Sequence, residues 1–114
     1  MKIVDQYREL DPGGGLGLAR EILRVYLDSS APLLRQAEDA IAADDAETLR
    51  RAAHSLKSSS ANVGGMALAG LFKQLEGLGK ESRLDEAALP LAAARREYER
   101  VLAEIHALLL AEAA

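Results

Sequence analysis

The chain has 114 residues, which is enough for one domain with its own hydrophobic core. Hydrophobic residues make up 49% of it but aromatic residues only 4%, and this composition, dominated by Ala and Leu, favours closely packed helices over a sheet. A net charge of −4 argues against a general nucleic-acid binder, and the lack of cysteine excludes disulfides and thiolate metal sites.

The N-terminal part of the chain contains two segments with helical periodicity. Residues 3–10 predict a short amphipathic helix, and the sequence Asp-Pro-Gly-Gly-Gly at 11–15 ends it. Residues 16–43 predict a long helix in which Pro32 removes one backbone hydrogen bond. The apolar residues that repeat at helical spacing in this long segment are Leu18, Ile22, Tyr26, Leu33, Ala37 and Ile41.

A third helix is expected over about residues 45–62. Asp44 lies three residues before Glu47, a spacing that resembles a capping box and marks the start of a helix. The pair Gly64-Gly65 predicts its end, because glycine tolerates the left-handed conformation of a helix cap.

Two more helices complete the predicted fold. One is expected over residues 66–80, and the other begins between residues 84 and 90 and continues to about residue 109. Pro90 is compatible with the first turn of this last helix. Four long amphipathic helices with short connections predict an all-α fold, an antiparallel up-down-up-down four-helix bundle. We expect residues 1–114 to form this single domain, with the short N-terminal helix covering one end.

The third helix carries the chemistry. On a helical wheel its small and apolar residues gather in an arc of roughly 120°, and His54 lies nearly opposite the middle of that arc. The arc contains Leu49, Ala52, Ala53, Leu56, Ser59, Ser60 and Val63. The neighbours of His54 on the outer face are Arg50, Arg51, Lys57, Ser58 and Ala61.

An exposed imidazole on a rigid helix suits phosphoryl transfer. A histidine with its ordinary pKa of about 6.5 is largely neutral and nucleophilic near pH 7. In-line phosphoryl transfer depends mainly on positioning and on charge stabilisation. Lys57 lies one turn after His54, where its ammonium group can meet phosphoryl oxygens. Spacing alone does not separate this role from that of a solvated surface histidine.

The sequence around His54 resembles the histidine-containing phosphotransfer (HPt) domain family. That family reads His-x-Leu-Lys-Gly-Ser-Ser, then a glycine, then leucines spaced toward an acidic or amide residue. Here the corresponding residues are His54, Leu56, Lys57, Ser59, Ser60, Gly64, Leu68, Leu71, Leu75 and Glu76. The motif covers about residues 52–76, and the order of helices on both sides agrees with the family.

The resemblance implies a role for each matching residue. His54 is the phosphorylated histidine, which accepts the phosphoryl group at Nε2, and Lys57 stabilises the attached group. Glu76 hydrogen-bonds the other ring nitrogen and orients the imidazole. Gly64 forms the turn between the two central helices, and Asn62 and Ser60 have structural roles.

The resemblance also implies a docking face and partners. Ser58 stands where the family usually has glycine, and we expect it to line the docking face with Ala61. Arg50 and Arg51 lie about one turn before His54, a position that fits either residues that only solubilise the helix or docking residues for an acidic receiver pocket, and we expect the docking role. The partners would be response-regulator receiver domains, with acidic active sites, and a hybrid sensor histidine kinase. No cofactor is expected on this chain, since the Mg²⁺ belongs to the receiver. We expect a monomeric phosphoryl carrier that is not itself an ATP-dependent kinase.

The sequence also predicts where in the cell the protein is located. No apolar run approaches the ~18–20 residues that cross a bilayer, and the first residues do not resemble a signal peptide. Together with the lack of cysteine, this predicts a cytoplasmic protein without membrane insertion.

Three other functions are alternatives to the phosphorelay hypothesis. The first is an HPt-like module that docks on a receiver or kinase without phosphotransfer, which is disfavoured by the presence of both His54 and Lys57. The second is the phosphoacceptor hairpin of a sensor kinase, which normally shows His-Glu where this chain has His54-Ser55. The third is a metal-carboxylate bundle, which needs Glu-x-x-His pairs that neither histidine provides.

Overall fold

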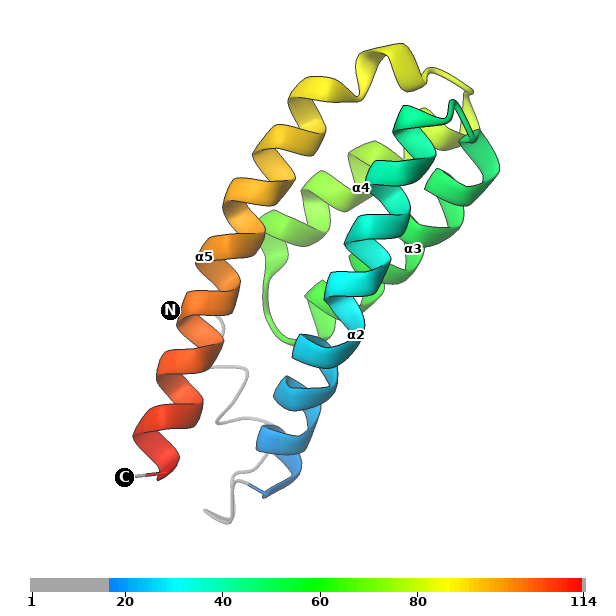
Figure 1. Ribbon diagram of the computed structural model, residues 1–114. Helices are drawn as coiled ribbons and strands as arrows, with labels where there is room; N and C mark the ends of the chain where they lie inside the picture. Colours follow the sequence, from blue (N-terminus) through cyan, green and yellow to red (C-terminus); the bar gives the residue numbers. More distant parts are fainter. Residues whose placement is uncertain (1–16, 114) are drawn as a thin grey trace.

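The computed structural model describes residues 17–113, which form four α-helices and one short 3₁₀ helix (Figure 1). These elements are α2 (Gly17–Ala42), α3 (Ala46–Asn62), α4 (Met66–Lys80), η1 (Leu84–Glu86) and α5 (Ala88–Ala113). No strand occurs among these residues, so the expectation of an all-helical fold is confirmed for them. The short helix predicted at residues 3–10 lies outside the described range.

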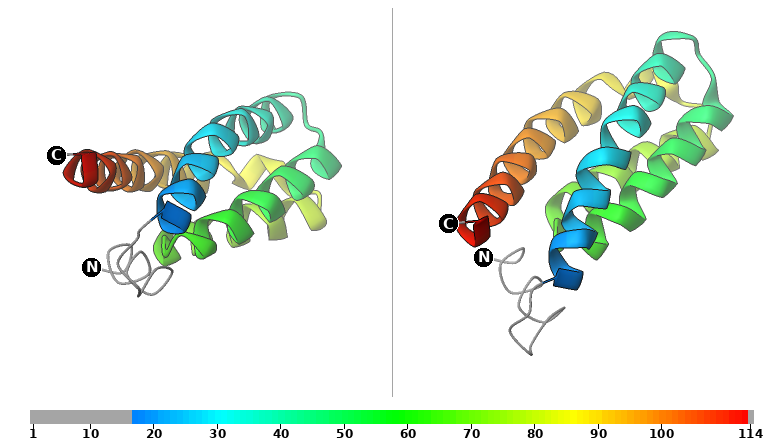
Figure 2. Two further views of the ribbon diagram at one scale, coloured as in Figure 1. Left: turned by 90° about the horizontal axis from the view of Figure 1, so that it is seen from below. Right: turned by 60° about the horizontal axis from the view of Figure 1, so that its bottom comes forward.

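The helices pack side by side into an elongated body with principal extents of 46 × 20 × 19 Å. The most extensive helix pair is α3 with α4, and α3 also packs along α2, so it lies between two neighbours (Figure 2). Helices α2 and α5 are longer, with 26 residues each, and extend past the turn that joins α3 to α4 (Figure 1). None of the helices described here is long and apolar enough to cross a membrane.

Each helix contributes an apolar stripe to one core. On α3 the buried residues are Leu49, Ala52, Ala53, Leu56 and Ser60, and Val63 follows just after the helix. This set matches the arc predicted from the helical wheel, apart from Ser59, which is only half-buried. Phe72 of α4 is completely buried. Helix α2 continues through Pro32, which lies on its exposed side.

The start of α3 differs from the prediction by one residue. Asp45, not Asp44, caps the helix, because its carboxylate accepts hydrogen bonds from the backbone N–H and the hydroxyl of Thr48. Asp44 lies in the preceding turn with φ of 55°, a conformation that aspartate tolerates better than most residues. The side chain of Glu47 pairs with Arg50 and does not complete a capping box. The capping-box interpretation of Asp44 and Glu47 was therefore wrong.

Two glycines place α4 against α3. Gly64 adopts φ of 84° in the turn between the helices, a left-handed conformation that favours glycine. Gly79 lies where the backbone of α4 approaches that of α3 closely. A Cβ atom there would be 2.9 Å from the backbone nitrogen of Arg50 and 3.0 Å from the carbonyl oxygen of Ala46. The absence of a side chain at Gly79 thus sets the distance between the end of α4 and the start of α3.

We expect Gly79→Ala to lower the free energy of unfolding by about 1–3 kcal/mol, because an added methyl group meets rigid backbone that must shift. Gly77→Ala is the matched control, since a Cβ at Gly77 meets nothing within 4 Å. It should be neutral or stabilising by up to about 1 kcal/mol through helix propensity. Urea denaturation measures the free energy of unfolding of both variants. Equal values would show that the close approach of the helices at Gly79 does not affect stability.

Candidate functional site

His54 projects from the middle of α3, and its side chain is 57% exposed. Its Nδ1 atom lies 2.8 Å from Oε2 of Glu76, which belongs to the neighbouring helix α4. The side chains of α3 on the opposite side are held in the core, so the helix cannot rotate without exposing them. The packing of α3 therefore fixes the direction in which the imidazole points.

Glu76 is a buried carboxylate, with only 6% of its side chain exposed. The hydrogen bond donated by Lys57 holds the pKa of Glu76 below its usual value, and that of His54 adds to this effect, although burial opposes it. An ionised carboxylate accepts hydrogen bonds only, so Nδ1 of His54 must be the donor. In the neutral ring, Nε2 then keeps its lone pair available for a reaction.

Lys57 lies one turn after His54 and donates a hydrogen bond to Oε1 of Glu76 over 2.7 Å. The two oxygens of Glu76 thus bind two different groups, the ring of His54 and the ammonium of Lys57. A second cation, Lys80, has its Nζ 3.8 Å from Oε2 of Glu76. The structure brings together His54, Lys57 and Glu76, and Lys80 lies beside them.

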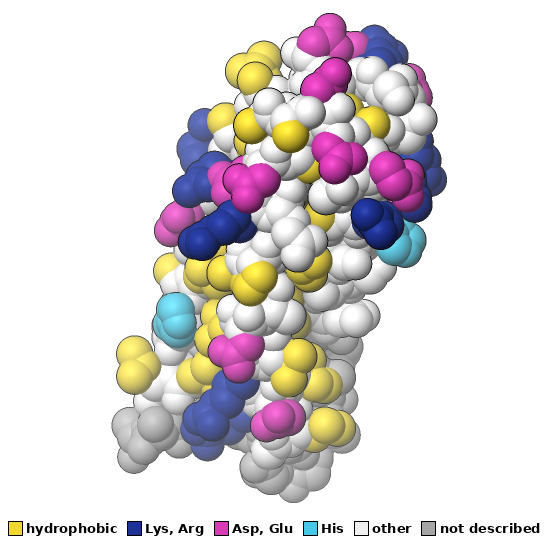
Figure 3. All heavy atoms as spheres, turned by 45° about the vertical axis from the view of Figure 1, so that its right-hand side comes forward, with side chains coloured by type: hydrophobic (Ala, Val, Ile, Leu, Met, Phe, Trp, Pro, Cys, Tyr) yellow, Lys and Arg dark blue, Asp and Glu magenta, His cyan; other side chains and the backbone are white. Residues whose placement is uncertain are grey.

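The two arginines before His54 are partly engaged within α3. Arg50 forms an ion pair with Glu47, and Arg51 lies 3.9 Å from the same carboxylate. Both are surface pairs between residues three or four positions apart, and such contacts are weak and readily exchanged. On the face shown in Figure 3, charged side chains of both signs are intermixed.

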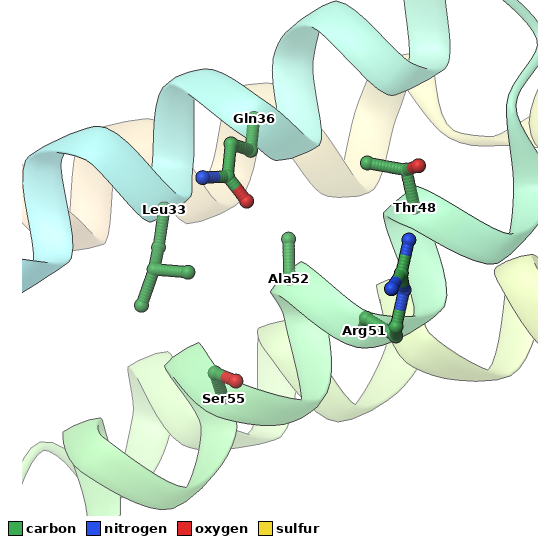
Figure 4. A pocket seen from close by; sticks show the side chains of 6 residues that line it. All are labelled: Leu33, Gln36, Thr48, Arg51, Ala52 and Ser55. Carbon is green, nitrogen blue, oxygen red and sulfur yellow. The ribbon is translucent and has the colours of Figure 1, made fainter.

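Hollows lie on both sides of α3, toward α4 and toward α2. One, of about 410 Å³, lies between α3 and α4 and has a largely apolar lining with a lysine from each helix. Its residues are Lys57, Ser58, Ala61, Met66, Ala69, Gly70 and Lys73. The other, of about 220 Å³, lies between α2 and α3 (Figure 4). Its residues are Leu33, Gln36, Thr48, Arg51, Ala52 and Ser55.

Only part of these linings could be predicted from the sequence. Ser58 and Ala61 were singled out, but their counterparts on α4 were missed. The available signal was the spacing of Met66, Ala69, Gly70 and Lys73, which places them on a face of α4 away from Phe72 and Leu75. The α2 residues of the second hollow carry no comparable pattern, since Leu33 also packs against the core.

Two buried hydrogen bonds hold α2 against its neighbours. The hydroxyls of Tyr26 and Ser60 share one over 2.9 Å, and those of Ser30 and Tyr98 share another over 2.8 Å. Burial raises the pKa of Tyr26 to about 12. Ser60 therefore links α2 to the helix that carries His54, in agreement with the structural role expected for it.

The described residues include no group of three or more histidine, cysteine, aspartate or glutamate side chains placed to hold a metal ion. His106, the second histidine, is exposed on α5 and has no side-chain hydrogen bond to the described part of the chain. The chemically distinctive group of side chains is thus the one around His54.

Comparison with known proteins gives two matches. A family model described as Hpt domain matches residues 21–109. The crystal structure of histidine-containing phosphotransfer protein B from Pseudomonas aeruginosa PAO1 is similar, with a TM-score of 0.78 and 28% sequence identity. That match covers 91% of this chain and 87% of the other. No sequence among curated proteins matches the chain.

Proposed function

The chain belongs to the Hpt domain family, and from this premise we propose that it carries a phosphoryl group on His54 between receiver aspartates of a two-component phosphorelay. The observation that supports this most strongly is the hydrogen bond between Nδ1 of His54 and the buried carboxylate of Glu76. It selects the tautomer in which Nε2 is the nucleophile, on an exposed side chain that a partner can reach.

The proposed step is an in-line displacement. Nε2 of His54 attacks phosphorus, the N–P bond forms, and the P–O bond to the receiver aspartate breaks, which returns that aspartate to its carboxylate form. Nδ1 keeps its proton on the hydrogen bond to Glu76, whose negative charge stabilises the positive charge developing on the ring. The reverse step delivers the phosphoryl group to a second receiver. The Mg²⁺ that this chemistry requires would sit on the receiver.

We propose that the partner docks over the face of α3 that surrounds His54. Arg50 and Arg51 would meet the acidic active site of the receiver, while Ser58 and Ala61 would form one wall of the hollow shared with α4. The antiparallel up-down-up-down order of the helices would present this face as one rigid surface. The partners in this proposal are response-regulator receivers and a hybrid sensor kinase, bound by a cytoplasmic monomer.

Lys57→Ala is expected to slow transfer or shorten the lifetime of phosphohistidine while the protein remains folded. Loss of a charge-assisted contact to the phosphoryl oxygens should cost on the order of 1–3 kcal/mol, or roughly 5- to 150-fold in rate. The decay of phosphorylated protein, followed by gel shift, measures this, and circular dichroism checks the fold. Unchanged transfer and decay would show that Lys57 does not act on the phosphoryl group.

The function itself is tested by two incubations. A phosphorylated receiver should transfer its phosphoryl group to the protein, and the receiver should lose that group. Incubation with ATP and Mg²⁺ alone should not phosphorylate the protein. The reason is that the sequence lacks a phosphate-binding loop, and members of this family carry phosphoryl groups rather than generate them. Labelling by ATP alone, with contaminating kinases excluded, would contradict the proposal.

A further inference from the structure

Glu76 is surrounded by one more cation than the proposed transfer step uses. Lys57 donates to Oε1 over 2.7 Å, and Lys80 lies 3.8 Å from Oε2, beyond hydrogen-bonding distance. The side chain of Lys80 is 60% exposed and follows Glu76 by one turn on α4. Among the side chains that the structure describes, residues 17–111, Lys80 has no other acidic partner within 4 Å.

The contact between Lys57 and Glu76 creates a conflict for the proposed reaction. To stabilise a phosphoryl group on His54, the ammonium of Lys57 must turn at least partly away from Oε1 of Glu76. The carboxylate is almost completely buried, and a buried charge that loses its paired cation is strongly unfavourable. The hydrogen bond from Nδ1 of His54 to Glu76 remains, and a second cation that approaches Glu76 would lower the cost of releasing Lys57.

We propose that Lys80 is a positioning residue that forms the ion pair with Glu76 when Lys57 turns to the phosphoryl oxygens. This inference rests on the function proposed above. A shortening of roughly 1 Å brings Nζ of Lys80 to hydrogen-bonding distance, and the flexible lysine side chain allows it. Arg50 is less suited, because its guanidinium does not lie within 4 Å of the Glu76 carboxylate. No covalent bond changes in this exchange; only the partner of each cation changes.

The exchange gives Lys80 an effect that depends on Lys57. Without Lys80, the ammonium of Lys57 stays on Glu76, and the phosphoryl group loses its stabilising contact. Lys80→Gln should therefore shorten the phosphohistidine lifetime, as Lys57→Ala does. The expected shortening is on the order of fivefold, which corresponds to the loss of one exposed ion pair. In a protein that already carries Lys57→Ala, Lys80→Gln should have no further effect.

The experiment uses phosphoramidate as the donor, so that docking of a receiver plays no part. Wild type, Lys80→Gln, Lys80→Arg and Arg96→Gln are each phosphorylated, and the decay of phosphohistidine is followed, alone and combined with Lys57→Ala. Arg96 is exposed on α5, and Arg96→Gln makes the same charge change but removes no cation within 4 Å of Glu76. Lys80→Arg should restore the wild-type lifetime, and Arg96→Gln should leave it unchanged.

A wild-type lifetime in Lys80→Gln would overturn the proposal. So would a shortening of equal size with and without Lys57, because a merely structural role acts independently of that residue. Failure of the wild-type protein to become phosphorylated on His54 contradicts the proposed function instead, so the two ideas fail in different ways.

Discussion

Replacement of His54 by glutamine is expected to abolish labelling by a phosphorylated receiver. Glutamine offers no nucleophilic ring nitrogen, and no other described side chain combines exposure with the same fixing hydrogen bond. The fold should survive, because His54 is more than half exposed and lies outside the core. Helical content by circular dichroism and the melting temperature should change little, although Glu76 loses one of its hydrogen-bond donors.

The matched control for this experiment is His106→Gln, which removes the other histidine. It should be phosphorylated as the wild type is, because His106 is exposed on α5 and makes no side-chain hydrogen bond or ion pair with the described residues. The label on wild type should be labile in acid and stable in alkali, as a phosphorus–nitrogen bond is. Labelling of His54→Gln at the wild-type rate would refute the assignment of the phosphoacceptor.

The second large effect is expected from Ser58→Trp. Ser58 is exposed one turn after His54, about 40° further round the helix, and it lines the hollow between α3 and α4. An indole there would occupy the space that a receiver needs in order to bring its aspartate to Nε2. Transfer from the receiver should fall to background, whereas Ser58→Gly should preserve or quicken it.

Two donors separate docking from chemistry in this variant. Phosphoramidate is small and needs only an accessible imidazole, so Ser58→Trp should still be phosphorylated by it at close to the wild-type rate. Normal transfer from the cognate receiver would place the docking face elsewhere on the molecule. Loss of reaction with both donors would show instead that the ring of His54 had been displaced.

Helix periodicity predicted much of this molecule because each long helix keeps a regular apolar stripe. The wheel of α3 placed Leu49 and Leu56 inside and His54 outside, and the structure agrees. The error at Asp44 has a local cause, since two adjacent aspartates both fit the pattern of a cap. Only backbone conformation distinguishes them, and Asp45 was selected through its contacts with Thr48.

Contacts between helices were harder to predict. Glu76 was identified through the family resemblance, because nothing in its sequence neighbourhood indicates that it lies beside His54. Gly79 shows the same difficulty, since the backbone of Arg50 that it contacts is distant in sequence. The attachment of Lys57 to Glu76 also required coordinates, because spacing alone indicates only that Lys57 can reach a group bound to His54.

The central claim is tested most directly by finding where the phosphoryl group goes. The protein is incubated with a phosphorylated receiver, and the product is examined by ³¹P NMR and by tandem mass spectrometry under non-acidic conditions. The expected product carries one phosphoryl group, attached to Nε2 of His54, and the receiver loses a matching amount. A receiver that binds but transfers nothing, or a phosphoryl group on any other residue, would contradict it.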